Sequence, residues 1–382
     1  MANYDYEIIN GRKIRVRPKE TVSEIDKNGY FRRQPNHFTT LFGDGENDLK
    51  AEGNKRYRLV WAKLCHWSNR AAIVRELEGL EDQISVNMVE HAPHEKNLGW
   101  EYVYNENNID PVLGDQFLSE AYYRADDDYQ GRTTVPALID TTTGKVVNND
   151  YNWLTTYFEV NFRPWHKKGA PELYPVELRE EIDKMNLWLF DNINNAVYRS
   201  SFSRSNEGHF DGVNTFYAAM DRLEKRLETN RFLFGDYVTD SDIRLYVTLA
   251  RLDIRYTAQL GETKRPLYNY KNLWGYAKEL WEIPAFAHHT DFAAIIRQGR
   301  IEGEEDGFRA STHYDLALPK IDWDAQWKVS TERAYLSSDP THPIYLGNNR
   351  RFDIDPTWYD LGAESPKKEE KETPPSCGCC CG

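Results

Sequence analysis

The sequence predicts a two-part fold, in which an α/β domain is followed by an all-helical domain. Strand and helix patterns alternate between residues 51 and 162, whereas apolar residues recur every three or four positions from 163 to 300. A short strand rich in apolar and aromatic residues is predicted within residues 56–64, it runs into Cys65, and a helical pattern begins directly after it. We expect an N-terminal extension at residues 1–50 and a C-terminal extension at residues 301–362.

Composition bounds the class of protein. The 382 residues suffice for two domains with large cores, and the net charge of −13 disfavours nucleic acid and anionic membranes as partners. The first residues lack the basic and apolar regions of a signal peptide, and the chain contains no apolar run of about 20 residues. Cys65 is the one cysteine before the C-terminal tail, which suits a reducing compartment. We therefore expect a cytoplasmic protein.

The α/β domain is expected to continue after the helix that follows Cys65. Residues 84–89 alternate like a strand. Residues 90–132 form a long polar segment, and a connection of that length is usually functional or an insertion over a site. Two further strands are predicted at residues 133–140 and 145–147, and a second helix begins near Asp150.

The helical domain has three strong signals. Apolar residues repeat with helical spacing over residues 178–197 and again over residues 213–227. Thr239 and Asp242 have the spacing of a capping box, with Asp in place of the usual Glu or Gln. The segment 243–254 that follows is apolar nearly all round and predicts a central buried helix. A further helix over residues 273–281 ends before Pro284.

Cys65 is the candidate nucleophile. At the first turn of a helix, unpaired backbone N–H groups and the helix dipole favour a thiolate. The alternative is a small buried apolar residue. Its place at a strand-to-helix junction, its lack of a disulfide partner in the body, and its polar neighbours His66, Ser68 and Arg70 favour the reactive interpretation.

Five short motifs occur in order, and together they carry a family resemblance. They are Cys65-x-Trp67-x-x-Arg70, Gly131-Arg132-x-Thr-Val135-Pro136, Asp242-Ile-Arg-Leu245, Thr248-Leu-x-Arg251 and Asn272-Leu-x-Gly-Tyr276. Over roughly residues 40–295 the chain resembles the Xi-class glutathione transferases, the S-glutathionyl-hydroquinone reductases. The resemblance implies a thioredoxin-like N-terminal domain over residues 51–162 and an all-α glutathione-transferase C-terminal domain over residues 163–300. It also implies glutathione as co-substrate, no required metal, and a homodimer.

The resemblance implies a thiol-transfer reaction. In such enzymes the cysteine thiolate attacks the glutathione sulfur of a glutathionyl-hydroquinone and expels the hydroquinone. A mixed disulfide remains, which a second glutathione resolves. Carried over to this sequence, Cys65 is the nucleophile, and the partners are quinone or hydroquinone conjugates.

The resemblance also implies binding residues. Trp100 would pack on glutathione, and Val135, joined by a cis peptide to Pro136, would offer backbone hydrogen bonds. Arg132 would assist with the glycine carboxylate. Tyr198 and Tyr256 lie where the family lines its hydroquinone pocket, and for both the alternative is an ordinary core tyrosine.

Two departures from the family pattern concern the site. Where the family has Cys-Pro-Trp-Ala, this chain has Cys65-His66-Trp67-Ser68. His66 would either stabilise the thiolate electrostatically or stand as a solvated residue of the first turn. The family's Glu-Ser pair for the γ-glutamyl group is replaced by Asp150-Tyr151, which is shorter at one position and bulkier at the other.

The C-terminal tail, residues 363–382, is charged and rich in proline, and we expect it to be disordered. It ends with four cysteines, which could bind a soft metal ion: Cys377, Cys379, Cys380 and Cys381. Three adjacent cysteines fit the spacing of a structural zinc site poorly. The alternative is an exposed, oxidation-prone tail.

Three functions follow in order of preference. The first is a glutathione-dependent reductase of glutathionyl-hydroquinones. The second is a glutaredoxin-like or dehydroascorbate-reductase-like enzyme, which needs Cys65 but no aromatic pocket. The third is a non-catalytic binding protein with a transferase fold, which the altered Asp150-Tyr151 pair keeps open.

Overall fold

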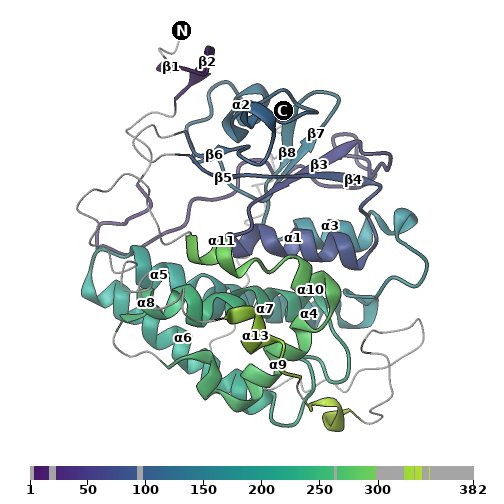
Figure 1. Cartoon of the computed structure of the whole chain (residues 1–382), viewed down its shortest axis with the longest axis vertical. Coiled ribbons are helices and arrows are strands. Elements are labelled where there is room, and N and C mark those ends of the chain that lie inside the picture. Colours follow the sequence, from purple (N-terminus) through teal and green to yellow (C-terminus); the bar gives the residue numbers. More distant parts are fainter. Residues whose placement is uncertain are drawn as a thin grey trace, which may run out of the picture.

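Two domains are stacked in the structure of this protein, a computed structural model (Figure 1). The structure describes residues 4–16, 23–92, 98–261, 265–297, 322–330, 332–337 and 344. The α/β domain forms the upper half of Figure 1 and the helical domain the lower half, with α1 (His66–Leu77) and α3 (Leu154–Val160) between them. This arrangement confirms the predicted fold class.

A four-stranded mixed sheet is the centre of the α/β domain. Its strands run in the order β4-β3-β7-β8, with β3 and β4 parallel and the other pairs antiparallel. Helices α1 and α3 lie on one face, and α2 lies on the other, where it packs against β8 (Figure 1). The remaining elements are β1 (Tyr6–Ile9), β2 (Arg12–Arg15), β3 (Tyr57–Trp61), β4 (Ile84–Met88), β5 (Glu90–His91), β6 (Trp100–Glu101), η2 (Glu106–Asn108), α2 (Leu118–Ala125), β7 (Ala137–Asp140), β8 (Lys145–Asn148) and η3 (Arg163–Trp165).

The helical domain packs around α7 (Asp240–Arg251), in which every residue is buried, as the apolar pattern predicts. Helix α7 contacts α1 of the α/β domain as well as α4 and α9 of its own domain. The other elements are η4 (Val176–Leu178), α4 (Arg179–Leu189), η5 (Phe190–Asn194), α5 (Ala196–Phe202), α6 (Asn206–Arg226), η6 (Leu252–Tyr256), α8 (Thr257–Gln259), η8 (Leu267–Asn269), α9 (Lys271–Trp281), α10 (Pro284–His288), α11 (Phe292–Arg297), α13 (Trp323–Trp327) and η10 (Ala334–Leu336).

Three elements differ from the sequence prediction. The polar segment 90–132 contains a helix, α2, that the sequence does not signal clearly. The helix expected near Asp150 begins at Leu154, after a turn. The apolar stripe over residues 178–197 does not form one helix, because a π-helical turn, η5, separates α4 from α5. This turn carries Asn194, whose side chain donates to the Arg244 carbonyl and to Thr248 on α7, so buried polar contacts set the break.

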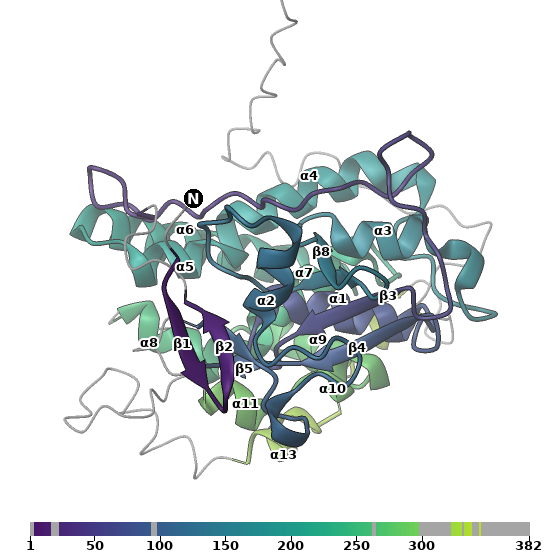
Figure 2. The same ribbon diagram turned by 90° about the horizontal axis from the view of Figure 1, so that it is seen from above.

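An N-terminal segment, residues 23–50, crosses both domains before it reaches β3 (Figure 2). On the helical domain, the Gly29 carbonyl accepts a hydrogen bond from the Arg204 N–H. On the α/β domain, Thr39 forms a β-bridge with Asn148 at the edge of the sheet, and Phe42 is buried in the main core. The segment therefore ties the two domains together.

The described helices include none long and apolar enough to cross a membrane. The C-terminal extension is described only at residues 322–330, 332–337 and 344. The predicted tail, residues 363–382 with its four cysteines, lies outside the described residues.

The capping box predicted at the start of α7 is confirmed. The Asp242 carboxylate accepts hydrogen bonds from the Thr239 N–H at 2.8 Å, the Leu233 N–H at 2.9 Å and the Tyr276 hydroxyl at 2.8 Å. Burial raises the pKa of Asp242 to about 6, and the hydrogen bonds from these donors oppose that rise because they stabilise the carboxylate.

Replacing Asp242 by Ala is expected to lower the free energy of unfolding by about 3 kcal/mol, because several buried donors lose their acceptor. Urea denaturation of both variants measures the change. The matched control is Asp44→Ala, which removes a fully exposed carboxylate paired with Lys50 and is expected to change stability little. Equal stability of Asp242→Ala and wild type would contradict the structural role of the box.

Candidate active site

Cys65 occupies the junction between the sheet and α1. Strand β3 ends at Trp61, and Cys65 is the N-cap residue of α1. Its side chain is buried, and the thiol donates to the Val135 carbonyl over 3.7 Å. The Val135–Pro136 peptide is cis, as the resemblance implies. The backbone carbonyl of Val135 therefore lies next to the thiol of Cys65.

Arg251 of α7 fixes the loop that precedes Cys65. Its guanidinium donates to the Lys63 carbonyl at 2.9 Å and to the Leu64 carbonyl at 3.0 Å. Arg251 is wholly buried, so these contacts form inside the interface between the two domains. The position of Cys65 thus depends on the helical domain as well as on its own.

Two buried guanidiniums act on Cys65. Burial lowers the pKa of Arg70 to about 9, whereas negative charge at Cys65 raises it. Burial also lowers the pKa of Arg251. Arg70 donates to the backbone carbonyl of Tyr151. Both guanidiniums are therefore buried in the neighbourhood of Cys65.

An aromatic cluster, Trp67, Tyr151, Tyr198 and Tyr256, lies beside Cys65. The Tyr198 ring centroid is 5.8 Å from that of Trp67 and 6.4 Å from that of Tyr256. The Tyr151 ring is 4.7 Å from Trp67. Burial, and then negative charge at Cys65, raises the pKa of Tyr198, and burial raises that of Tyr256 well above its usual range. Both hydroxyls therefore stay protonated at neutral pH and can donate hydrogen bonds.

His66 differs from both sequence interpretations. It is only 1% exposed, so the interpretation as a solvated first-turn residue is wrong. Burial first, and then the charges of Arg251 and Arg70, hold the pKa of His66 well below its usual range. His66 is therefore neutral and does not supply the positive charge that thiolate stabilisation requires.

Arg33 is a site residue that the sequence analysis missed. Its guanidinium lies 4.4 Å from the Tyr198 ring centroid and 4.6 Å from that of Trp67. Its Nε donates to Asn195 at 3.0 Å, while Nη2 is buried without a hydrogen-bond partner among the described residues. Arg33 comes from the irregular N-terminal segment, where no periodic pattern signals its destination. Arg251 was detectable in the sequence as part of the motif Thr248-Leu-x-Arg251.

Arg132 and Asp150 hold the N-terminal segment in this structure. The Arg132 guanidinium pairs with Glu24 at 2.9 Å, and its backbone N–H donates to Gln34 at 3.0 Å. Asp150 accepts a hydrogen bond from Asn36 at 3.0 Å. The side chains of both residues thus bond to this segment.

Trp100 lies in the same apolar cluster as Cys65, Trp67 and Val135. Its indole N–H donates to the Thr133 carbonyl at 3.1 Å, and its ring stacks on His91 with the centroids 3.9 Å apart. These contacts fix the orientation of Trp100 close to the cis turn. Among the described residues, no group of three or more His, Cys, Asp or Glu side chains is placed to hold a metal ion.

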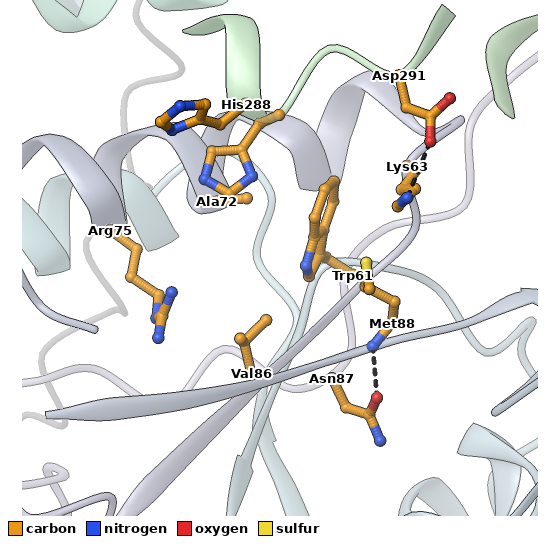
Figure 3. A pocket seen from close by; sticks show the side chains of 10 residues that line it. Trp61, Lys63, Ala72, Arg75, Val86, Asn87, Met88, His288 and Asp291 are labelled. Carbon is orange, nitrogen blue, oxygen red and sulfur yellow. Dashed lines mark hydrogen bonds and ion pairs between the residues drawn. The ribbon is translucent and has the colours of Figure 1, made fainter. Parts of the chain in front are cut away.

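A cavity of about 330 Å³ lies between α1, β4 and α10, away from this site. Figure 3 shows its lining, with Trp61, Val86 and Met88 from the strands and the ion pair of Lys63 with Asp291. Cys65 does not line it. The cavity is therefore not the place where the thiol meets a substrate.

Comparison with known proteins agrees with this architecture. Residues 197–279 match the family described as Glutathione S-transferase, C-terminal domain. Glutathione S-transferase omega-like 2 of Schizosaccharomyces pombe is 34% identical over 280 residues, covering 70% of this chain and 88% of that protein. Glutathionyl-hydroquinone reductase YqjG of Escherichia coli is 32% identical over 273 residues, covering 70% of this chain and 83% of YqjG.

The solved structures agree as well. The glutathione S-transferase Xi of Phanerochaete chrysosporium has a TM-score of 0.64 and 33% identity, and the match covers 71% of this chain and 87% of that one. The sheet and the helical domain together define a glutathione transferase fold. With these relatives, the chain belongs to the Xi class of the glutathione transferases.

The low pKa of His66 predicts an effect on acid stability. Below about pH 6.5 the unfolded chain binds a proton at His66 that the folded chain does not. The free energy of unfolding therefore decreases as the pH is lowered. The free energy of unfolding of wild type should therefore drop more steeply than that of His66→Asn, by up to about 1.4 kcal/mol per pH unit. Urea denaturation between about pH 6.5 and 4.5 measures both slopes.

His166 is a control of opposite sign. Burial lowers its pKa, but the hydrogen bond and charge of Glu78 leave it above the usual value. Stability from this pair is present at low pH and is lost as pH rises through the folded pKa. His166→Asn should therefore be less stable than wild type at low pH and approach the stability of wild type at higher pH.

For the His66 prediction, parallel pH profiles of the free energy of unfolding for wild type and His66→Asn would contradict a neutral, buried His66.

Proposed function

We propose that this chain is a glutathione-dependent reductase of glutathionyl-hydroquinones. The single observation that carries the proposal is the setting of Cys65. It is the N-cap residue of α1, the buried guanidinium of Arg251 holds the loop directly before it, and it lies beside the tyrosines Tyr198 and Tyr256. The similarity to YqjG, a glutathionyl-hydroquinone reductase, supports this choice of substrate.

The proposed reaction has two thiol-transfer steps. First, the Cys65 thiolate attacks the glutathione sulfur of the conjugate, so that an S–S bond forms and the bond from sulfur to the ring carbon breaks. The ring takes the electron pair and a proton and leaves as the hydroquinone. A second glutathione thiolate then attacks the mixed disulfide, which releases glutathione disulfide and regenerates Cys65. The two electrons that reduce the conjugate come from the two thiols.

The residues around Cys65 have assigned parts in this proposal. The backbone of Val135 binds the cysteinyl unit of glutathione, and Trp100 packs on the tripeptide. Asp150 and Tyr151 take the γ-glutamyl group, and Arg132 takes the glycine carboxylate. Since Asp150 and Arg132 also bond to residues 24–36, glutathione binding exchanges some of these contacts.

The aromatic side of the proposed site takes the ring. Tyr198 and Tyr256 keep their protons at neutral pH and lie among flat apolar surfaces, which suits a hydroxylated aromatic ring. A glutaredoxin-like enzyme needs no such surface. The aromatic cluster therefore favours the hydroquinone conjugate over a small disulfide as the preferred substrate.

The proposal includes a cytoplasmic homodimer. The absence of a second cysteine from the body of the chain before the tail suits a reducing compartment, and the family resemblance supports a dimer. Gel filtration with light scattering measures the mass in solution against the 44.7 kDa of one chain.

Replacing Cys65 by Ser should abolish turnover of glutathionyl-menadiol, the hydroquinone conjugate kept reduced under anaerobic conditions, with a loss of at least about a thousandfold in kcat/KM. The background for this test is a variant in which the four tail cysteines are serine, since Cys65 is then the one thiol of the chain. Intact mass after a single turnover should show one glutathione adduct, with menadiol released.

The Cys65→Ser version of the same background should gain no adduct. A parent chain that folds correctly but forms no adduct with glutathionyl-menadiol overturns the proposed substrate. An adduct formed with glutathione disulfide alone would then favour the glutaredoxin-like alternative.

A further inference from the structure

His66 carries a buried polar atom without a partner at the site. Its ring is 1% exposed, and its Nδ1 lies 3.2 Å from the Thr248 hydroxyl. The other ring nitrogen, Nε2, is buried and has no hydrogen-bond partner among the described residues. Buried polar atoms in folded proteins are paired in the great majority of cases, so an orphan at an active site indicates a ligand.

The tautomer of His66 follows from its neighbours. The Thr248 hydroxyl oxygen accepts a hydrogen bond from the Asn194 side chain at 2.7 Å. Among its described partners, this buried hydroxyl can donate its own hydrogen to His66 Nδ1, which then accepts it. Nδ1 is then unprotonated, and the hydrogen of the neutral imidazole sits on Nε2. The orphan atom is therefore a donor.

The surroundings of the ring indicate what Nε2 meets. The His66 centroid lies 4.3 Å from that of Trp67, 5.3 Å from Tyr198 and 5.8 Å from Tyr256. With Nδ1 turned to α7, Nε2 lies among these aromatic rings, one residue from Cys65. These are the same rings that form the aromatic side of the site beside Cys65.

We propose that His66 Nε2–H donates a hydrogen bond to a ring oxygen of the hydroquinone and stabilises that oxygen as negative charge develops on it. The inference rests on the proposed function and deepens it. It assigns His66, which stands where the family pattern has proline, to recognition of the leaving group.

The electron balance of the reaction places charge on that oxygen. The conjugate first shifts a proton from the ring hydroxyl next to the sulfur onto the sulfur-bearing carbon, which gives the ketone tautomer. The Cys65 thiolate then attacks the glutathione sulfur, the S–S bond forms, and the electron pair of the C–S bond moves through the ring to the ketone oxygen. The product is the phenolate of the hydroquinone, which takes a proton from water. A preorganised N–H at the developing oxyanion lowers the barrier to this step.

Two substitutions separate the two nitrogens of His66. In His66→Asn, the amide takes the place of Nδ1 and keeps a partner for Thr248, but nothing replaces Nε2. In His66→Gln, the longer amide places an N–H near the former Nε2. The readout is the ratio of kcat/KM for glutathionyl-menadiol, the reduced conjugate, to kcat/KM for a glutathione mixed disulfide, because a disulfide leaves as a thiolate and needs no ring oxygen stabilised.

The expected result is a fall in this ratio of about 10- to 100-fold in His66→Asn, and recovery to within about fivefold of wild type in His66→Gln. Equal losses on both substrates in His66→Asn, or no loss on either, overturn the assignment of His66. A wild-type enzyme that accepts the disulfide but releases no menadiol overturns the proposed function, and the assignment falls with it.

A measurement on the wild-type fold provides the second test. With ¹⁵N-labelled histidine, the Nε2–H signal that is absent in His66→Asn reports His66 directly. Addition of menadiol, the free leaving group, should shift this signal downfield as the hydrogen bond forms. A signal on Nδ1 instead of Nε2, or no shift at saturating menadiol, contradicts the proposal even if the variants fold poorly.

Discussion

The contact between Arg251 and the loop before Cys65 is the constraint on which the site depends. A helix of one domain reaches the backbone carbonyls of Lys63 and Leu64 in the other, and Arg251 is wholly buried there. A buried guanidinium is tolerated only when its donors are satisfied. Docking of the domains and placement of the loop before Cys65 are therefore coupled through Arg251.

The same contact explains how an acidic protein holds a site for anions. The chain carries a net charge of −13, yet the guanidiniums of Arg70, Arg251 and Arg33 gather around Cys65 and Tyr198. In a water-excluded environment these charges act far more strongly than on the surface. Glutathione and a hydroquinone oxyanion are both negative, so local charge outweighs the overall balance.

Regular periodicity made most of the fold predictable, and irregular segments hid the rest. The strand before Cys65, α1, α6 and the capping box of α7 follow from spacing that depends only on neighbours in sequence. Helix α2 and the π-helical turn η5 do not, because tertiary polar contacts such as that of Asn194 decide them. Arg33 was unpredictable for the same reason, since its segment has no period and is placed by contacts with both domains.

The replacement of proline by His66 has a physical explanation in this setting. Position 66 is the first residue of α1, where the backbone N–H has no helical partner and proline fits well. Helix geometry therefore tolerates other residues here at little cost. Histidine adds a side chain that Thr248 of α7 orients, and a donor that faces the aromatic cluster. The departure from the family pattern thus places a polar side chain among the aromatic rings next to Cys65.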